Sequence, residues 1–237
     1  MTELVIVNVK DGVGELILNR PRQRNALIGP LVLELQRGLD MLVEDDSVKA
    51  IVLRGAEGYF CAGLDLRAFA QDPAPDWRHE FQANWAQLHK TFFLANKPVI
   101  GALEGFAIAG GSALALACDF LVIGEQAFFH IAEVERGMMA PINIVWLRIR
   151  HSYGLALKMA LLGQRHYGES LYRLGIADQC VKDADVVPTA HEIAARFVGF
   201  DREAVQQLKQ SVRAVFYSDA SGEDGFDRLL AQARGTA

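Results

Sequence analysis

The stretch that decides the fold is PVIGALEGFAIAGGSALALACDFLVIG, residues 98–124. It begins with a buried strand in KPVIGALEG, continues through a helix that starts at two glycines, and ends in another core strand, FLVIGE. A similar apolar strand, VKAIVLRG at residues 48–55, precedes it in the chain. Strands that alternate with helices in this order predict parallel pairing through right-handed crossovers, and therefore an α/β core.

The flanking segments extend this prediction in both directions. Residues 5–9 and 12–18 alternate around the turn KDG and predict an antiparallel hairpin. Helical spacing of leucines predicts a helix over residues 31–45, and a further helix is expected over 85–94. The polar, proline-containing segment 70–84 is typical of a mobile surface segment.

The second half of the chain reads as mostly helical after Trp146. From Ser218 onward the tail is polar, and we expect it to be loosely held. No internal repeat and no long linker separates a second domain. We therefore expect an α/β core over residues 1–181 and a C-terminal helical oligomerisation section over 182–237, both within one domain unit.

Composition narrows the classes of function. The 237 residues are 51% apolar and 22% charged, with a net charge of −5 and no basic stripe, which argues against nucleic acid or an anionic membrane as the main partner. Three widely spaced cysteines suit neither a disulfide framework nor a metal site. These few cysteines favour a reducing, cytoplasmic location, and the sequence predicts neither a signal peptide nor an uninterrupted membrane span.

Two glycine-containing loops are the candidate ligand-binding segments of the chain. FCAGLDL at 60–66 and FAIAGG at 106–111 each follow a predicted strand and lead towards a helix. Ligands of α/β folds gather at the carboxyl ends of strands, and N–H groups at helix starts lack internal partners. Two such loops aimed at one point would form an oxyanion hole, although each loop by itself is more simply a tight turn that needs glycine.

Four motifs follow one another along the chain: FCAGLDL, GFAIAGGSALALACD, FFHIAEVERGMMAP, and YGLALKMALLGQRHYGESLYRLGIADQCV, which ends at Val181. In this order and spacing they resemble the crotonase, or enoyl-CoA hydratase/isomerase, family. The resemblance implies a crotonase-like spiral of ββα units with a C-terminal helical section. It also implies assembly as a homotrimer or as a hexamer made of two trimers.

The resemblance assigns binding roles to particular residues. The oxyanion hole would be formed by the backbone N–H groups of Leu64 and Gly110, with the thioester carbonyl of an acyl-CoA between them. CoA is part of this substrate, so no separate cofactor and no metal is expected. The residues implied to lie along the CoA moiety are Ala26, Ala62, Asp65 and Leu66, with Arg22 and Arg24 as candidate phosphate partners. A solvated turn is an equally simple explanation for the two arginines.

Family hydratases use two glutamates, and the resemblance places them at Ala113 and Glu133. Only Glu133 is a carboxylate in this chain. One base suffices to move a proton between two carbons of the same substrate, so we expect a 3,2-enoyl-CoA isomerase that proceeds through a dienolate. ERGMMAP and GLDL also resemble the family's isomerases. A simpler alternative treats Glu133 as a surface carboxylate near Arg136.

Two other functions stay open. A hydratase-like or other crotonase reaction would borrow a carboxylate from Asp65 or Glu135. A catalytically inactive acyl-CoA-binding or assembly protein would keep the fold without turnover, which is consistent with Ala113. His130 is expected to be a packed or hydrogen-bonded histidine and Asp119 a structural residue, while Ser112 has no paired histidine for nucleophilic catalysis.

Overall fold

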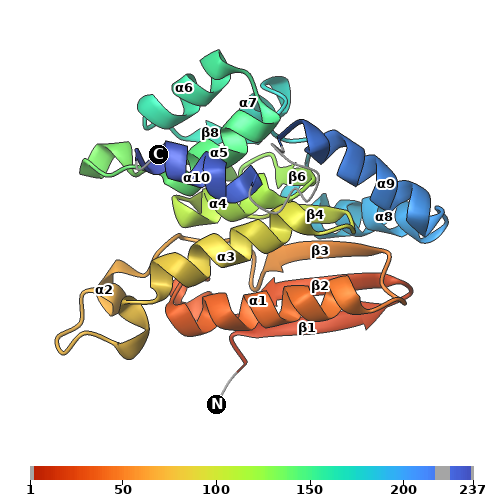
Figure 1. Ribbon diagram of the computed structural model, residues 1–237, viewed down its shortest axis with the longest axis horizontal. Coiled ribbons are helices and arrows are strands. Elements are labelled where there is room, and N and C mark those ends of the chain that lie inside the picture. Colours follow the sequence, from red (N-terminus) through yellow and green to blue (C-terminus); the bar gives the residue numbers. More distant parts are fainter. Residues whose placement is uncertain (1–2, 217–224, 236–237) are drawn as a thin grey trace.

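A computed structural model describes residues 3–216 and 225–235. Its main sheet has the strand order β1-β2-β3-β4-β6-β9, in which only β1 and β2 pair antiparallel (Figure 1). The predicted hairpin and the predicted parallel core are therefore confirmed. The strands are β1 (Val5–Lys10), β2 (Val13–Leu18), β3 (Ala50–Gly55), β4 (Val99–Leu103), β6 (Phe120–Gly124) and β9 (Gln179–Val181).

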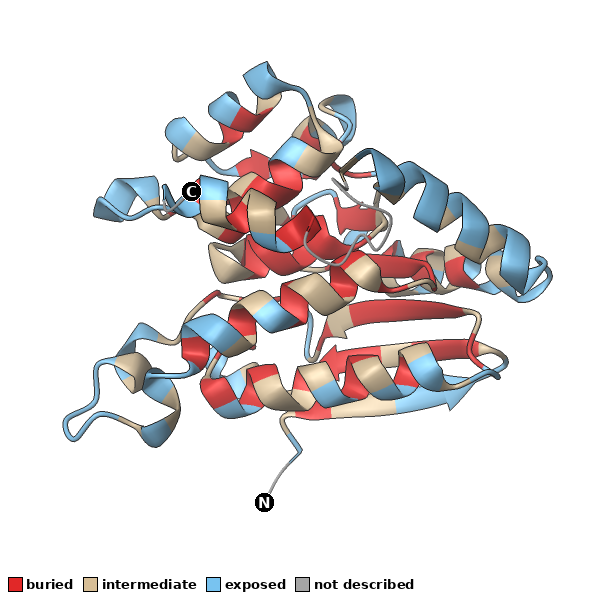
Figure 2. Cartoon of the chain, viewed as in Figure 1, coloured by how far each residue is buried: buried red, intermediate tan, exposed pale blue. Residues whose placement is uncertain are grey.

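Both faces of this sheet are covered, which explains why its central strands β3, β4 and β6 are almost entirely apolar. Helix α1 (Gly29–Glu44) packs on β1 and β2, and Leu31, Leu35 and Leu39 on its inner face are fully buried. Helix α8 (Val186–Val198) covers the opposite face, over β2, β3, β4 and β6. Figure 2 shows the resulting buried band through the sheet, with helix α9 (Arg202–Arg213) mostly exposed outside it.

A second, small sheet is what the sequence reading missed. It consists of β5 (Phe106–Ile108), β7 (Phe128–His130) and β8 (His166–Tyr167), in that order. Strands of two or three residues carry too little periodicity to be predicted. With them, β4-β5-α4 and β6-β7-α5 form successive ββα units, where α4 is Gly110–Ala117 and α5 is Pro141–Arg150. The repeating unit expected from the resemblance is therefore present.

Two expectations about the outer segments were wrong in part. Helix α3 (Phe81–Leu94) begins four residues before the expected Trp85, so the end of segment 70–84 is helical. The tail also contains helix α10 (Gly225–Arg234), which packs against α5 and α3 through buried Phe226 and Leu230. Their spacing of four residues is the helical signal that the polar composition obscured. Residues 218–224 of the expected loose tail lie outside the described residues.

The remaining elements are three short helices and several 3-10 turns spread along the chain. The helices are α2 (Leu66–Phe69), α6 (Tyr153–Leu161) and α7 (Gly168–Arg173). Short 3-10 turns occupy Pro21–Gln23, Asp76–Arg78, Val134–Arg136, Asp183–Asp185 and Ala214–Phe216. Within residues 3–216 and 225–235, no helix combines the length and apolar character needed to cross a bilayer.

Candidate active site

The two glycine loops lie side by side, as the family resemblance implied. Cys61 N donates to Phe106 O at 3.0 Å, and Ile108 N donates to Cys61 O at 3.0 Å, so the loops run side by side as a short parallel bridge. A Cβ atom on Gly111 would lie 2.3 Å from Cys61 O. Glycine is thus required for the loops to approach this closely.

The backbone around Leu64 and Gly110 presents two free donors. Gly63 O and Asp65 N both hydrogen bond to Leu27, at 2.8 and 2.9 Å, so the N–H of the intervening Leu64 points the other way. Gly110 begins helix α4, where first-turn N–H groups lack helical partners. Among the described residues, neither of these N–H groups donates to a backbone acceptor.

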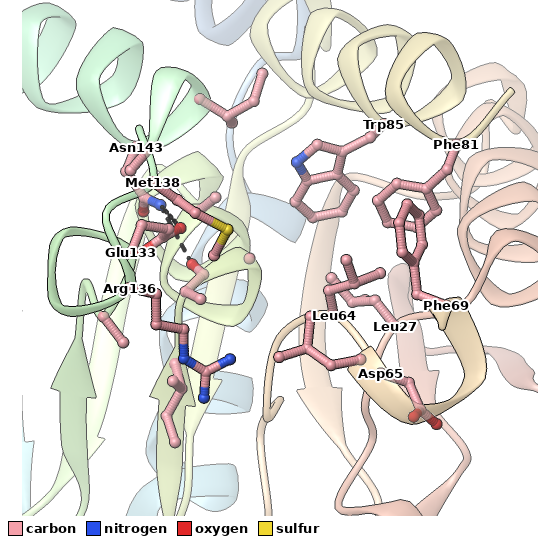
Figure 3. Close-up of a pocket in the computed structure, with 18 of the residues that line it drawn as sticks. Leu27, Leu64, Asp65, Phe69, Phe81, Trp85, Glu133, Arg136, Met138 and Asn143 are labelled. Atoms are coloured by element: carbon pink, nitrogen blue, oxygen red, sulfur yellow. Dashed lines mark hydrogen bonds between the residues drawn. The ribbon is translucent and has the colours of Figure 1, made fainter. Parts of the chain in front are cut away.

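Both donors border one cavity of about 690 Å³ (Figure 3). Trp85, Phe81 and Phe69 stand on the wall that also carries Leu64, while Glu133 lies across the cavity from them in this view. The aromatic residues come from α2 and α3, which places the segment expected to be a mobile surface partly in the cavity wall. The other apolar residues of the lining include Leu27, Ile108, Met138, Met139 and Ile142.

Glu133 is the carboxylate of the cavity lining that keeps one oxygen free of hydrogen bonds among the described residues. Its Oε1 accepts a hydrogen bond from Asn143 Nδ2 at 3.1 Å, and its Oε2 is buried without a partner among the described residues. Burial raises the pKa of Glu133 above its usual value, against smaller opposing effects of backbone N–H groups, Asn143 and Arg136. A carboxylate in this state is a better base than an exposed one.

The other carboxylate of the lining is already engaged. Asp65 Oδ1 accepts from Ala68 N at 3.0 Å, which caps α2, and its Oδ2 lies 3.1 Å from an Arg20 nitrogen. Its pKa is lowered by these contacts, although burial opposes them. Ala113, one turn into α4, faces the same cavity with a methyl group. Glu135 is exposed, is not part of the lining, and lies 3.5 Å from His130 Nε2.

The residues predicted to contact CoA divide into two groups. Ala26, Ala62, Asp65 and Leu66 all line the cavity. Arg22 and Arg24 are exposed on the turn after β2 and are not part of its lining. The structure therefore brings the first group together with Glu133, Leu64 and Gly110 and leaves the arginines apart. Their role as phosphate partners stays a prediction.

Several residues of the cavity were missed. Asn143 is a polar residue within the apolar run INIVW, and that contrast was a usable signal. Three arginines other than Arg22 and Arg24 line the cavity: Arg67, Arg136 and Arg234. Arg234 comes from α10, which is distant in sequence from the other residues of the site, so no local sequence pattern indicated its position.

The accessory residues have the structural roles expected of them. His130 is buried and its Nε2 hydrogen bonds to Gly163 O at 3.0 Å. Ser112 Oγ donates to the backbone oxygens of Ala107 and His130, both at 2.9 Å. Asp119 accepts from Val99 N at 2.7 Å and pairs with Lys209. In the part of the chain that the structure describes, no cluster of three or more His, Cys, Asp or Glu side chains could hold a metal ion.

The family model described as enoyl-CoA hydratase/isomerase matches residues 8–226. The chain belongs to this family. A carnitinyl-CoA dehydratase of Proteus mirabilis is 32% identical over 95% of this chain and 85% of its own length, and a 2,3-dehydroadipyl-CoA hydratase of Escherichia coli K12 is 33% identical over 90% and 82%. The crystal structure of a monofunctional enoyl CoA isomerase from M. smegmatis superposes with a TM-score of 0.78 at 26% identity, covering 94% of this chain and 98% of that one.

These similarities confirm the crotonase fold class and make the protein an acyl-CoA-processing member of its family. The relatives are named as dehydratase, hydratase and isomerase, at comparable similarity. Overall similarity therefore does not select one reaction, and the choice depends on the residues of the cavity.

Proposed function

We propose that this protein is a 3,2-enoyl-CoA isomerase that shifts a double bond with a single carboxylate, Glu133. One observation carries the proposal. Glu133 is the carboxylate of the cavity lining that has a buried oxygen without a partner among the described residues, whereas Asp65 is engaged and position 113 is alanine. Water addition by the family's two-glutamate route would lack its second carboxylate.

The proposed reaction balances with one proton. The thioester oxygen accepts hydrogen bonds from the N–H groups of Leu64 and Gly110. Glu133 takes a proton from C2, and the electron pair of that C–H bond spreads over the thioester carbonyl and the C3–C4 double bond as a dienolate. Glu133 then returns the same proton to C4, which leaves the double bond between C2 and C3. Loss of one oxyanion donor typically costs about 3–4 kcal/mol of transition-state stabilisation.

The environment of Glu133 suits this proton transfer. An aromatic and aliphatic cavity limits its solvation, so burial raises its pKa and strengthens it as a base. The proton returned to C4 must come from the same carboxyl group, and an apolar cavity that excludes water slows the exchange of that proton with solvent. Deuterium supplied by the solvent should therefore enter the product at C4 only in part.

The test offers purified protein a 3-enoyl-CoA and a 2-enoyl-CoA of the same chain length. We expect conversion of the first, little hydration of the second, and loss of isomerisation by roughly 10³-fold or more in Glu133→Gln. Glu135→Gln, which removes a nearby exposed carboxylate outside the cavity lining, is the matched control and should keep its activity. Hydration that survives Glu133→Gln would contradict the mechanism.

A second candidate function is hydration or dehydration, because two of the relatives compared above carry those names. It predicts that the 2-enoyl-CoA is hydrated faster than the 3-enoyl-CoA is isomerised. Binding of both substrates without turnover would instead favour an inactive acyl-CoA-binding or assembly protein. The same pair of substrates thus separates all three functions.

The proposal includes assembly as a homotrimer or hexamer in the cytoplasm. Exposed apolar side chains at helical spacing near α9 support assembly, since Leu208, Val212 and Val215 are 68%, 70% and 77% exposed. Sedimentation velocity of the full chain tests this, and a single monomeric species would contradict it.

A further inference from the structure

The side-chain nitrogen of Asn143 contacts both the proposed base, Glu133, and the peptide that carries the Gly110 N–H. Its Nδ2 donates to Glu133 Oε1 at 3.1 Å and also lies 3.3 Å from Ala109 O, which accepts from it (Figure 3). The Asn143 side chain lies in the first turn of α5 and the residue is only 2% exposed. A buried amide with two acceptors on one nitrogen fixes the positions of both acceptors.

The second acceptor belongs to the oxyanion hole. Ala109 O is the carbonyl of the peptide unit whose N–H is that of Gly110. A planar peptide moves as a unit, so a hydrogen bond to its oxygen orients the N–H on its other side. It also polarises the amide, which makes that N–H a stronger donor.

The peptide concerned needs such support. Ala109 has φ 51° and ψ −112°, a conformation that an alanine adopts only when its surroundings impose it. Its N–H donates to His130 O at 2.8 Å, and its oxygen also accepts from Ala113 N at 3.1 Å. Asn143 adds a side-chain donor from helix α5 to these two backbone contacts.

Helix α5 provides the rigid reference for these contacts. It packs against α4, the helix that begins at Gly110, and against α10. Glu133 by contrast lies in a loop, directly before the 3-10 turn Val134–Arg136, whose residues are exposed. The base on the loop and the donor at the start of α4 are therefore both held to the same helix.

We propose that Asn143 is a positioning residue that sets the distance between the base and the oxyanion hole, by binding Glu133 Oε1 and Ala109 O with one amide group. The inference rests on the proposed function, because it assigns roles to Glu133 and Gly110. Asn143 itself transfers no proton.

The cavity holds other charged groups besides Glu133, and the test must separate their effects from that of Asn143. The charged side chains of the cavity lining are Asp65, Arg67, Arg136 and Arg234. Among these, Arg136 lowers the pKa of Glu133, as does the hydrogen bond from Asn143, while burial raises it. Removal of the Asn143 donor should raise the pKa further, since the carboxylate loses a partner and Arg136 remains.

The experiment compares Asn143→Ala and Asn143→Asp with the wild-type chain. Asp keeps the shape of Asn but offers no donor when ionised, so a packing role predicts that it is the milder change. A positioning role predicts that it is at least as harmful as Ala, since it faces two acceptors. Asn96→Ala is the matched control, because Asn96 accepts a hydrogen bond from Arg213 and is not part of the cavity lining.

Two readouts are independent of turnover. The first is the titration of the Glu133 carboxyl carbon by NMR in protein with ¹³C-labelled glutamate, assigned by its absence in Glu133→Gln. The second is the ¹³C shift of the thioester carbonyl of a bound saturated acyl-CoA. We expect both Asn143 variants to move the titration to higher pH and to reduce the carbonyl polarisation. In kinetics, kcat should fall roughly 10- to 100-fold with little change in KM.

Each outcome bears on the inference. Unchanged Glu133 titration and unchanged carbonyl shift in both variants would overturn it, even if the wild-type protein is an isomerase. An Asp variant milder than Ala would also overturn it in favour of packing. If the wild-type chain isomerises nothing but both NMR readouts move as expected, the proposed function fails while the positioning role is upheld.

Discussion

Gly111 and Cys61 touch backbone to backbone, so closely that a Cβ atom on Gly111 would lie 2.3 Å from Cys61 O and 2.9 Å from Cys61 Cβ. This contact joins the loop after β3 to the start of α4. Neither partner is a flexible side-chain end that could move aside cheaply. The geometry of the proposed oxyanion hole therefore depends on a residue to which the proposed mechanism gives no chemical role.

Gly111→Ala is expected to lower the free energy of unfolding by roughly 1–3 kcal/mol, because the added methyl group overpacks a rigid junction. It should also reduce kcat, since the Leu64 and Gly110 donors would separate. Denaturant unfolding and steady-state kinetics measure the two effects. Gly154→Ala is the control: nothing lies within 4 Å of a Cβ there, and this exposed helical site should gain about 0.5 kcal/mol. Equal stabilities of the two variants would contradict the packing argument.

Glu133→Gln should stabilise the protein near neutral pH while it abolishes activity. Burial raises the pKa of Glu133 in the folded state, so the ionised form is disfavoured by folding. The associated loss of stability begins above the unfolded pKa, grows as pH rises through the folded pKa, and is absent below both. Gln keeps an oxygen for Asn143 and carries no charge.

The measurement is Tm against pH for Glu133→Gln and for Glu135→Gln. The first variant should gain over the wild-type chain as pH rises, by roughly 2–4 °C for each kcal/mol recovered, and lose its advantage in acid. Glu135 is exposed, so its variant should stay within about 0.5 kcal/mol of wild type at all pH values. If Glu133→Gln proved less stable than wild type near neutral pH, the carboxylate would be stabilised where it lies.

The pKa of Glu15, which lies on β2 and contacts α8, is shifted in the opposite direction to that of Glu133. Hydrogen bonds from His191, and then from Arg54, lower its pKa to about 2 against the effect of burial. The resulting stability is fully present above the unfolded pKa and is lost as pH falls through the folded one, between about pH 4.5 and 2.

Glu15→Gln should therefore reduce stability by roughly 1.5–3 kcal/mol at pH 7 and flatten the acid limb of the unfolding curve. Circular dichroism during acid titration follows both effects. The control is Glu192→Gln, an exposed change on the same helix as His191, and it should leave the acid limb as steep as in wild type. Identical acid limbs for all three chains would mean that Glu15 does not anchor α8 to the sheet.

The sequence predicted the parts of the fold that repeat over many residues. The leucines of α1 and the apolar runs of β3, β4 and β6 have enough length to show their period, and the hairpin turn at Asp11 and Gly12 has the positive φ angles that Asp-Gly favours. The small sheet escaped because β5 and β7 have three residues each. Helix α10 was missed because its polar composition outweighed its three buried side chains, Phe226, Leu230 and Ala233.

The candidate site divides in a similar way. Leu64, Gly110 and Glu133 could be placed through the family resemblance, since motifs fix their spacing. Asn143 stands out as a polar residue in an apolar run, but its partners are set by the packing of α5 against α4; Arg234 reaches the cavity through the packing of α10, which no local pattern encodes. Arg22 and Arg24 follow from their charge and their place in the segment RQRNAL, but neither fixes the direction of a side chain on an exposed turn.

Ala113 gives the last and most direct prediction, because it faces the cavity where a second carboxylate would have to stand. Ala113→Glu should raise hydration of a 2-enoyl-CoA above the wild-type rate and reduce isomerisation, since two carboxylates can hold a water and divide the proton transfers between them. Both activities are followed by the absorbance of the conjugated thioester. Ala113→Gln has the same bulk without the charge, and it should lose isomerisation without gaining hydration. Equal hydration by the Glu and Gln variants would show that the choice of reaction does not depend on a carboxylate at this position.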